Sequence, residues 1–353
     1  MTWVGEVFNG MKFDVVIGNP PYQEEAKATS DNPIYHLFMD TAYEIADKVS
    51  LITPARFLFN AGKTPKAWNQ KMLNDQHLKV VCYEQKSAEI FPNTDIKGGV
   101  AVTYRDARED FGAIGVFVHY AKLRAILHKV EAHHDFSPIR EIIHLQNKFN
   151  LTTLYADYPQ FKAIVGSGGK EKRLTTPIFE QLQVFSKAMN RGDDVQILGL
   201  IKNKRHYRWI NRKYLEPHDN LDKYKVFVPK SNGSGALGEV LLTPIIGTPL
   251  IAKPLVGFTF SFISFGAFDT EIEAEAMLKY VKSKFARTML GILKITQDNL
   301  PRTWAKVPLQ NFTPQSDIDW SKSIPEIDQQ LYAKYGLNEA EVEFIETKVK
   351  ELA

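Results

Sequence analysis

An apolar run stopped by two adjacent prolines constrains this chain more than any other feature. Residues 13–18 (Phe-Asp-Val-Val-Ile-Gly) lead directly into Asn19, Pro20, Pro21 and Tyr22. An apolar run ended by glycine and proline predicts a buried strand followed by a rigid loop, because proline lacks an N–H group and fixes φ. The loop therefore carries an amide, bare carbonyls and an aromatic ring at the carboxyl end of a strand, where open α/β sheets bind ligands.

These groups suit a substrate amine that is a poor nucleophile, such as the exocyclic amine of adenine. We expect the side-chain oxygen of Asn19 and the carbonyl of Pro20 to accept hydrogen bonds from its two hydrogens, as preorganised dipoles. Tyr22 offers a face on which a base flipped out of its duplex can stack. The alternative interpretation is a Pro-Pro turn with a surface amide and a surface tyrosine.

Residues 13–22 resemble motif IV of the amino-group DNA methyltransferases that methylate adenine. They most resemble the restriction-modification type, whose target-recognition domain follows the catalytic domain. Residues 95–104 resemble the motif VIII strand of that group. The segments 294–298, 318–323 and 332–337 resemble its C-terminal part, so the similarity covers nearly the whole chain.

The resemblance implies methylation of adenine N6 in double-stranded DNA, with S-adenosyl-L-methionine as the methyl donor. It assigns catalytic roles to Asn19, Pro20, Pro21 and Tyr22. It also places Gly18, Asn19 and Pro20 beside the cofactor.

The elements expected after the motif loop have the order of the second half of a doubly wound sheet, with an antiparallel final strand. Pro33 should open an amphipathic helix whose apolar side carries Leu37, Phe38, Ala42, Ile45 and Ala46. We expect a second helix near residues 66–74 and strands at 49–54, 78–83 and 99–104.

These patterns predict a partial doubly wound, Rossmann-like methyltransferase half-domain at residues 1–125. An α+β target-recognition domain should follow at residues 126–315, and a helical segment at 316–353. By resemblance, the helix with Tyr35 and His36 is motif V, and the strand that ends at Pro54 is motif VI.

The cofactor-binding half of the resembled family is missing from the expected order. It needs at least two βα units of roughly 30 residues each before motif IV, whereas twelve residues precede Phe13. We therefore expect a split or truncated enzyme, with a separate chain as the source of the cofactor half or of an endonuclease. Two glycine-rich stretches, 164–168 and 233–238, lack the strand–turn–helix context of a cofactor loop and are interpreted as flexible loops. The second is a candidate for contact with DNA phosphates.

A dense basic segment marks the second domain. Six Lys or Arg residues and no Asp or Glu lie between Gly199 and Leu215, with two Tyr and one Trp interleaved. Cations at this density suit phosphates, and Arg, Asn and His reach base edges in the major groove. The alternative is a solvated basic strand pair whose aromatic side chains face the core. The predicted DNA-binding residues are Lys202, Lys204, Arg205, His206, Arg208, Arg212 and Lys213.

Composition excludes several other classes. The single Cys82 rules out a disulfide framework and a cysteine zinc site, and it fits a reducing cytoplasm. No apolar stretch is long enough for a membrane span, and the N-terminal residues lack the basic and apolar pattern of a secretory signal, so we expect none. The net charge of +3 is too small to argue for DNA by itself.

Other patterns carry weaker expectations. Residues 271–294 predict one long amphipathic helix, and residues 327–352 predict two short helices around Gly336. Phosphate contacts near the long helix are weakly supported for Arg287, Lys294, Arg302 and Lys306. His133, His134 and Asp135 are interpreted as surface residues without a metal, because no further ligand lies at a suitable spacing.

Three functions remain open from the sequence. The first is site-specific adenine methylation in a restriction-modification system. The second is a DNA-binding specificity module, or an inactive remnant of such an enzyme, without catalysis. The third is methylation of RNA or protein, because Asn-Pro-Pro-Tyr also serves other amino-group and glutamine methyltransferases. The basic segment argues against a protein substrate.

Overall fold

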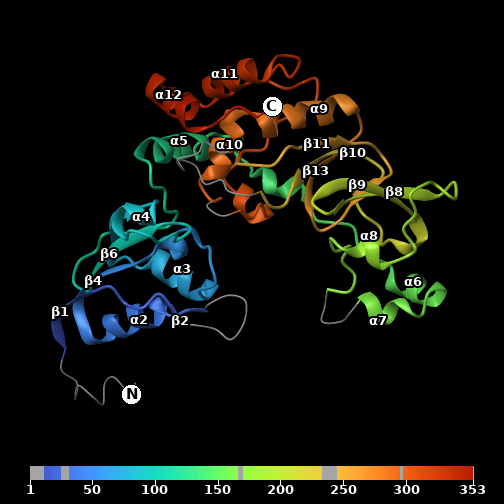
Figure 1. Ribbon diagram of the computed structural model, residues 1–353. Helices are drawn as coiled ribbons and strands as arrows, with labels where there is room; N and C mark the ends of the chain where they lie inside the picture. Colours follow the sequence, from blue (N-terminus) through green and yellow to red (C-terminus); the bar gives the residue numbers. More distant parts are fainter. Residues whose placement is uncertain (1–11, 25–31, 166–169, 233–244, 295–296, 353) are drawn as a thin grey trace. The chain divides into compact units, whose positions relative to one another are not determined.

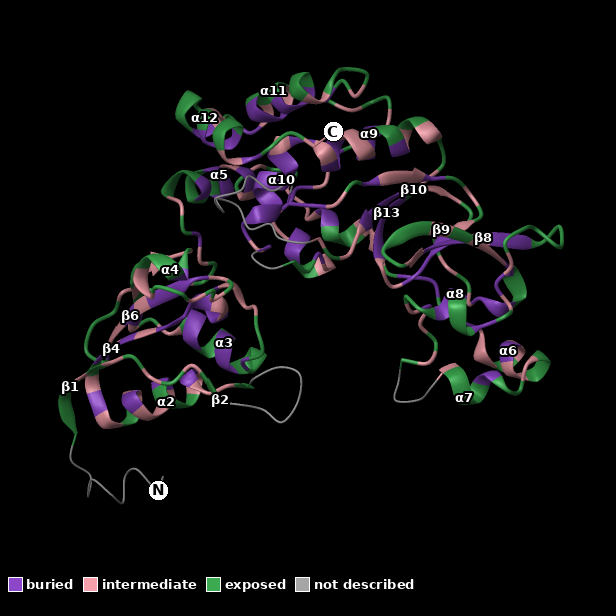
Figure 2. Ribbon diagram, in the orientation of Figure 1, coloured by how far each residue is buried: buried purple, intermediate pink, exposed green. Residues whose placement is uncertain are grey.

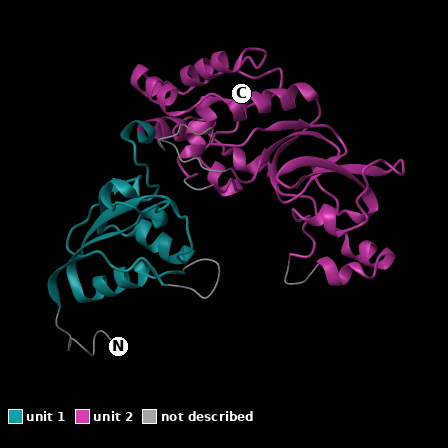
Figure 3. Cartoon of the chain, in the orientation of Figure 1, with its two compact units in different colours: residues 1–124 teal, residues 125–353 magenta. Residues whose placement is uncertain are grey.

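The protein is a mixed α/β chain with several sheets, described here from a computed structural model (Figure 1). The structure describes residues 12–24, 32–165, 170–232, 245–294 and 297–352. The chain divides into two compact units, residues 1–124 and 125–353, coloured separately in Figure 3. Among the described residues, no helix has the length and apolar character needed to cross a membrane.

The first unit is built on a four-stranded sheet. Its elements are β1 (Phe13–Gly18), β2 (Gln23–Glu24), β3 (Asn32–Pro33), α2 (Tyr35–Ile45), β4 (Ala46–Pro54), η1 (Ala55–Phe59), α3 (Lys66–Asn74), β5 (Leu78–Glu84), α4 (Ser87–Ile90) and β6 (Val100–Asp106). The strand order is β1-β4-β6-β5. β1 and β4 are parallel, whereas β6 is antiparallel to both of its neighbours. The expected antiparallel final strand is therefore present, and it lies between β4 and β5.

The core of this unit lies on one face of the sheet. In the parallel register Val16 stands beside Val49, and both belong to a cluster with Met39 of α2 and with Trp68 and Met72 of α3. Alternate strand residues point to opposite faces. The residues on either side of Val16 therefore point away from this core.

The prediction that β1 is buried was wrong. Phe13, Val15 and Ile17 are 47%, 47% and 78% exposed, and β1 is coloured as exposed in Figure 2. The physical reason is position, because β1 is the last strand at one edge of the sheet and these side chains point away from the α2 and α3 core. An apolar sequence indicates that the side chains of a strand need to be packed against other residues. It does not indicate whether the described chain provides those residues.

The first helix also differs from its prediction. α2 begins at Tyr35 rather than at Pro33, which lies in β3. Its buried side consists of Tyr35, Met39 and Ala42, while Leu37 and Phe38 are exposed. In contrast, α3 has the predicted bounds, and the three later strands were predicted to within a few residues.

The second unit combines two sheets with helices at both ends of its sequence. Its elements are α5 (Ala121–Glu131, which begins in the first unit), η2 (Ile139–Ile142), β7 (Ile143–His144), α6 (Leu151–Asp157), α7 (Phe161–Val165), α8 (Ile178–Gln181), β8 (Asp194–Ile201), β9 (Lys204–Asn211), η3 (Arg212–Tyr214), β10 (Tyr224–Pro229), β11 (Leu250–Ala252), β12 (Val256–Phe258), β13 (Phe262–Phe268), α9 (Glu271–Lys282), α10 (Lys284–Gly291), η4 (Pro301–Trp304), α11 (Ile324–Lys334) and α12 (Glu339–Lys348). One sheet has the order β11-β10-β13-β7 and the other β12-β8-β9.

β8 and β9 form a tight hairpin that projects from the second unit in Figure 1. Ile201 pairs with Lys204, so the connecting loop has two residues, Lys202 and Asn203. Both have positive φ, at 49° and 60°, which is the pattern of a type I′ turn. The turn matches the natural twist of the paired strands and therefore fixes their register.

The helix predicted over residues 271–294 is broken at Ser283. Ser283 has extended backbone angles, and its hydroxyl accepts a hydrogen bond from the backbone N–H of Ala286 in the first turn of α10. The carboxylate of Asp328 accepts two further bonds, from the N–H groups of Lys284 and Phe285 at 3.0 and 2.9 Å. These acceptors satisfy N–H groups that a helix start leaves free, so the break is stabilised locally.

The two C-terminal helices were predicted correctly, apart from an earlier start at Ile324. They lie on either side of Gly336, whose φ is +62°. Phe285 of α10 stacks on Tyr335 with ring centres 5.0 Å apart, so this segment packs within the second unit.

Candidate active site

Two parallel strands bring their carboxyl ends to the same edge of the first sheet. β1 and β4 pair with Gly18 opposite Leu51. β1 continues into the loop of residues 19–22, and β4 ends at Pro54, just before η1. Because the strands run in the same direction, the two proline-containing turns are neighbours at the edge where α/β proteins bind ligands.

A cavity of about 990 Å³ opens at this edge. Its lining comprises the motif loop (Asn19, Pro20, Pro21, Tyr22, Gln23), the segment before and at the start of α2 (Pro33, Tyr35), the segment from the end of β4 (Pro54, Arg56, Gly62, Lys63, Thr64) and the segment before β6 (Phe91, Thr94, Asp95, Ile96). The volume is at the upper end of the range of small-molecule sites. The four residues with predicted catalytic roles therefore line one cavity that has room for a nucleobase.

The motif loop is anchored on its far side. The carbonyl of Tyr22 accepts a hydrogen bond from the N–H of Ile34 at 3.1 Å. The following two residues pair as β2 with β3, where Gln23 lies opposite Pro33. These contacts fix the loop, while the amide of Asn19 stays exposed at the cavity.

Two aromatic rings meet in the cavity wall. The ring centres of Tyr22 and Phe91 are 6.4 Å apart, with 67° between the ring planes. The hydroxyl of Tyr22 is buried and makes no hydrogen bond of ordinary geometry with any described residue. Burial raises the pKa of Tyr22, and the neighbouring side chain of Asn19 partly offsets this increase. The hydroxyl of Tyr22 and the side chain of Asn19 therefore lie together at the cavity.

The sequence did not identify Arg56 or the segment opposite it as part of the site. The guanidinium of Arg56 donates to the carbonyl of Lys97, and the N–H of Ala55 donates to the carbonyl of Gly99 at 3.0 Å. These bonds join the segment after β4 to the segment before β6. The available signal was the second proline-ended strand, because its carboxyl end had to reach the same sheet edge as the motif loop.

Gly99 makes this close approach possible. Its φ is +73°, a backbone angle that residues other than glycine rarely adopt. A Cβ added at this position would lie 2.3 Å from the carbonyl oxygen of Glu84. A larger residue would therefore push the segment before β6 away from β5 and change the cavity wall.

The start of α2 contributes a buried phenol. Burial raises the pKa of Tyr35 to about 12, against smaller opposing effects of Thr64 and Arg56. The next residue, His36, has its ring centre 5.5 Å from that of Trp68, and burial lowers its pKa. Tyr35 is therefore a neutral hydrogen-bonding group of the cavity wall, and His36 is neutral at pH 7.

The seven predicted DNA-binding residues lie on and around β9. Lys202, Lys204 and Arg205 are exposed at the tip of the β8–β9 hairpin. His206 and Arg208 are half-buried, and the guanidinium of Arg208 makes a hydrogen bond with the carbonyl of Tyr207. The exposed cations are thus concentrated at the free end of the hairpin.

The last two of the predicted cations are engaged in ion pairs at the base of the hairpin. Arg212 donates to both carboxylate oxygens of Asp222, one of them at 2.7 Å. Lys213 lies 2.7 Å from Asp157, which also accepts from the hydroxyl of Tyr214. These contacts balance both charges within the fold.

Two of the weaker phosphate candidates are excluded by their burial. Arg287 and Lys294 are 1% and 0% exposed, so neither reaches a ligand at the surface. The amphipathic pattern that placed them near the end of a helix also placed them on its inner side. Lys306 is paired with Glu131 at 2.5 Å.

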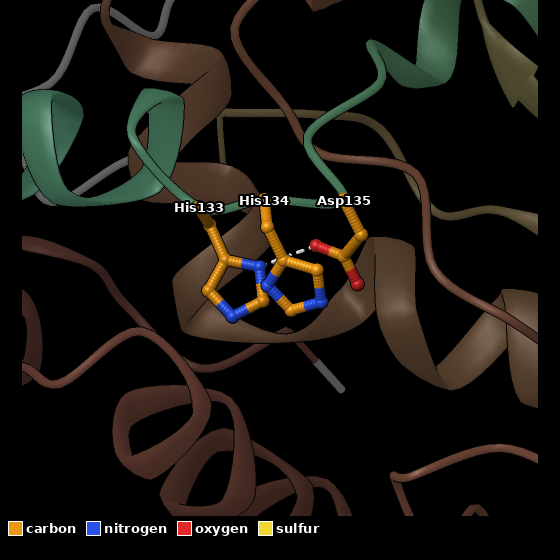
Figure 4. A group of neighbouring side chains, drawn as sticks. All are labelled: His133, His134 and Asp135. Carbon is orange, nitrogen blue, oxygen red and sulfur yellow. Dashed lines mark hydrogen bonds and ion pairs between the residues drawn. The ribbon is translucent and has the colours of Figure 1, made fainter.

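His133, His134 and Asp135 bring their possible metal-binding atoms within 4.8 Å of one another (Figure 4). A nitrogen of His133 is hydrogen-bonded to Asp135, whose other oxygen lies 3.4 Å from the ammonium of Lys334. Lys334 is also paired with Asp317 at 2.9 Å. Both carboxylate oxygens of Asp135 therefore already have partners. The positive charge of Lys334 beside this carboxylate opposes the binding of a cation. The two glycine-rich stretches, 164–168 and 233–238, lie partly or wholly outside the described residues.

The fold and site together define a class of protein, in which a mixed α/β unit carries an Asn-Pro-Pro-Tyr loop and a cavity with room for a nucleobase at the carboxyl ends of two parallel strands. Comparison with known proteins matches part of the chain to one family. Residues 1–91 match the model of the Eco57I restriction-modification methylase family. The resemblance to restriction-modification adenine methyltransferases is therefore confirmed, and it rests on the part of the chain that holds the motif loop and most of the cavity lining.

One curated relative is described as an "Uncharacterized adenine-specific methylase" from Mycoplasma pneumoniae (strain ATCC 29342 / M129 / Subtype 1). It is 33% identical over 98 residues, which are 26% of this chain and 23% of the relative. The chain therefore matches about a quarter of that protein's length. A solved structure of the type IIL restriction-modification enzyme MmeI in complex with DNA aligns with 95% of this chain and 56% of its own, at 10% identity and a TM-score of 0.43.

Proposed function

We propose that this chain is the adenine-binding and DNA-recognition part of a restriction-modification methyltransferase that acts on adenine N6. The observation that carries the proposal is the position of Asn19 and Pro20 in the wall of a cavity with room for a nucleobase, within the segment matched to the Eco57I family. A turn with only a structural role needs no such cavity beside an exposed amide.

In this proposal the motif loop binds the amine of a flipped adenine. The side-chain oxygen of Asn19 and the carbonyl of Pro20 accept its two hydrogens, which localises the nitrogen lone pair for attack. The rings of Tyr22 and Phe91 pack on the base, and Pro21 keeps the loop rigid. S-adenosyl-L-methionine, when bound, supplies the electrophilic methyl group.

The exposed side of β1 supports the proposal of a further, cofactor-binding half. Val15 and Ile17 form an apolar surface on the last strand of the sheet, next to Gly18 at the motif loop. β1 pairs with β4 in parallel, and parallel strands are normally covered on both faces of their sheet. We propose that strands and helices which hold the cofactor add at this edge, and that Gly18, Asn19 and Pro20 lie next to the methyl group. A separate chain is one source of that half.

The second unit is proposed to bind the duplex through the β8–β9 hairpin. A two-stranded ribbon fits the major groove of B-DNA, and the cations of the tip, Lys202, Lys204 and Arg205, are exposed. Arg212 and Lys213 contribute only if DNA replaces their present carboxylate partners.

The competing proposal is a specificity module that binds DNA without catalysis. It is motivated by β1 being an edge strand, which leaves the described sheet without the cofactor-binding strands. Titration of S-adenosyl-L-methionine into the purified chain separates the two proposals. If the cofactor does not bind to the chain alone, and does not bind after the product of the neighbouring gene is added, only the non-catalytic specificity module remains.

The deciding experiment replaces Asn19 by Ala in the chromosomal gene and maps N6-methyladenine in the genome by single-molecule sequencing. We expect one sequence motif to lose its methylation. Loss of an equivalent preorganised hydrogen-bonding group lowers catalytic rates by about 10²–10³-fold, or roughly 3–4 kcal/mol. A rate loss of that size leaves the motif largely unmodified.

The matched control is Asn74→Ala, which removes an exposed amide at the end of α3. This variant should retain every methylated motif. Retention of every motif by Asn19→Ala as well would contradict the proposed role of the amide.

A further inference from the structure

A turn in the second unit holds two cations from separate segments around one aromatic ring. The turn lies in the connection of residues 259–261 between β12 and β13, and it contains Phe260 and Ser261. The guanidinium of Arg173 lies 5.7 Å from the centre of the Phe260 ring, and the ammonium of Lys230 lies 2.8 Å from it. The N–H of Phe260 donates to the carbonyl of Leu174, and the N–H of Lys230 donates to that of Ser261, at 2.8 and 2.9 Å. The three segments are thus fixed to one another.

No carboxylate among the described residues forms an ion pair with either cation. The neighbouring Lys172, in contrast, is paired with Glu216 at 2.6 Å. Burial, and secondly the charge of Arg173, lower the pKa of Lys230 to about 8, although Asp298 acts in the opposite direction. Holding like charges close together costs free energy, and an anion bound between them removes that cost.

Two hydroxyls complete the set of donors. The side-chain oxygens of Thr176 and Ser261 are 3.0 Å apart. A hydroxyl has one hydrogen to donate, so their mutual bond uses one hydrogen and leaves the other for a ligand. A guanidinium, an ammonium and a hydroxyl together form the donor set typical of phosphate sites.

We propose that Arg173 and Lys230, with the hydroxyls of Thr176 and Ser261, bind a phosphodiester group. The site adjoins the basic strand, because the guanidinium of Arg205 on β9 lies 5.8 Å from the ring centre of Phe262, two residues after Phe260. Sequence analysis did not identify this site, because the two cations are 57 positions apart in the chain. That the phosphodiester belongs to duplex DNA rests on the proposed function.

The first arm of the test measures the affinity of the full chain for a fluorescein-labelled DNA duplex at several salt concentrations. The site variant is Arg173→Gln/Lys230→Gln. The control is Lys253→Gln/Lys322→Gln, which makes the same change in net charge at exposed lysines with single, long ion pairs of 3.7 and 3.8 Å. Each phosphate contact contributes about 0.9 to the slope of log K against log salt. We expect the site variant to lose about 1–2 from the slope and the control to retain it.

The second arm needs no DNA binding. It compares the melting temperature of each protein in sodium phosphate and in sodium chloride at equal ionic strength. Phosphate should raise the melting temperature of the wild type and the control above its value in chloride, because a ligand of the folded state stabilises it. The site variant should gain less from phosphate than the wild type and the control do, because only the general effect of the salt remains. Far-UV circular dichroism checks that the variant is folded.

The outcomes separate the two proposals. If the wild type binds no DNA, the proposed DNA function fails, while loss of phosphate stabilisation in the site variant alone still supports the anion site. If the variant changes the phosphate response but not the DNA slope, the site takes a free phosphate and its assignment to DNA is overturned. If the site variant behaves like the control in both arms, the site itself is overturned.

Discussion

Asn19 owes its position to the residues that follow it. Pro20 and Pro21 fix the backbone and have no N–H group to donate, so the chain leaves β1 in one direction. Asn19 then lies beyond the end of the paired strand, with its side chain at the cavity. The chemistry of the site therefore begins with backbone geometry.

Tyr22 should act through its ring if it stacks on the base. Tyr22→Phe keeps the ring and should retain most of the methylation of the modified motif. Tyr22→Ala removes the stacking surface, which is worth about 1–3 kcal/mol for a base on an aromatic side chain, and should reduce methylation strongly. The measurement is the methylated fraction of that motif in cells that carry each variant.

The same pair of variants tests the hydroxyl of Tyr22. A large loss in Tyr22→Phe, equal to that in Tyr22→Ala, would contradict a stacking role and assign the function to the hydroxyl instead. The melting temperature of both variants provides the control, because Tyr22 also packs beside the core of the first unit.

At the scale of residues, the sequence identified candidate site residues where they occupy nearby positions in one motif. Asn19 and Tyr22 were identifiable because their motif is contiguous. Arg56 and Phe91 join the same cavity from segments that are remote in the chain, and Arg56 is tied there by a bond to a backbone carbonyl. The periodicity of a sequence carries no signal for such a bond.

At the scale of elements, the break between α9 and α10 shows what periodicity misses. The apolar spacing continues through Ser283, and serine is tolerated inside helices, so one helix was predicted. The break depends on a carboxylate supplied by Asp328, which is 45 positions later in the chain. The strands of the first unit were predictable because each is a short apolar run bounded by turn residues.

Asp328 also gives a prediction about pH. Burial raises its pKa to about 6, and the N–H groups of Phe285 and Lys284 oppose the increase. The unfolded chain loses this proton near pH 3.9, so between about pH 4 and pH 6 the folded protein binds more protons. The free energy of unfolding should therefore fall as pH rises through this window, by roughly 3 kcal/mol for this group.

Asp328→Asn removes this titration. Urea denaturation of wild type and variant across the window gives the difference in unfolding free energy at each pH. The variant should gain stability relative to the wild type as pH rises from about 4 to about 7. Parallel profiles for the two proteins would show that Asp328 titrates alike in the folded and unfolded states.

At the scale of the whole molecule, the open side of β1 has consequences for assembly. An exposed apolar edge strand is a template for association with other chains. Ile17→Lys places a charge on a side chain that is 78% exposed, so it should change the melting temperature little. We expect it to reduce self-association of the isolated chain in sedimentation velocity, and to abolish methylation if a cofactor-binding half covers this surface.

The matched control for Ile17→Lys is Val16→Lys, on the opposite face of the same strand. Val16 packs on the α2 and α3 core, so a lysine there should lower the melting temperature strongly. Equal destabilisation by the two variants would show that Ile17 is covered within the chain itself.

The type I′ turn at Lys202 and Asn203 has a consequence for how the sequence of such a protein evolves. Its residues and the adjoining Lys204 and Arg205 are exposed, whereas the other end of β9, at Ile210 and Asn211, is buried. Exchanges at the tip therefore leave the packing below them intact. If the hairpin contacts bases of the DNA, surface substitutions at its tip can change the recognised sequence. The loop of residues 19–22, which is proposed to bind the adenine, need not change.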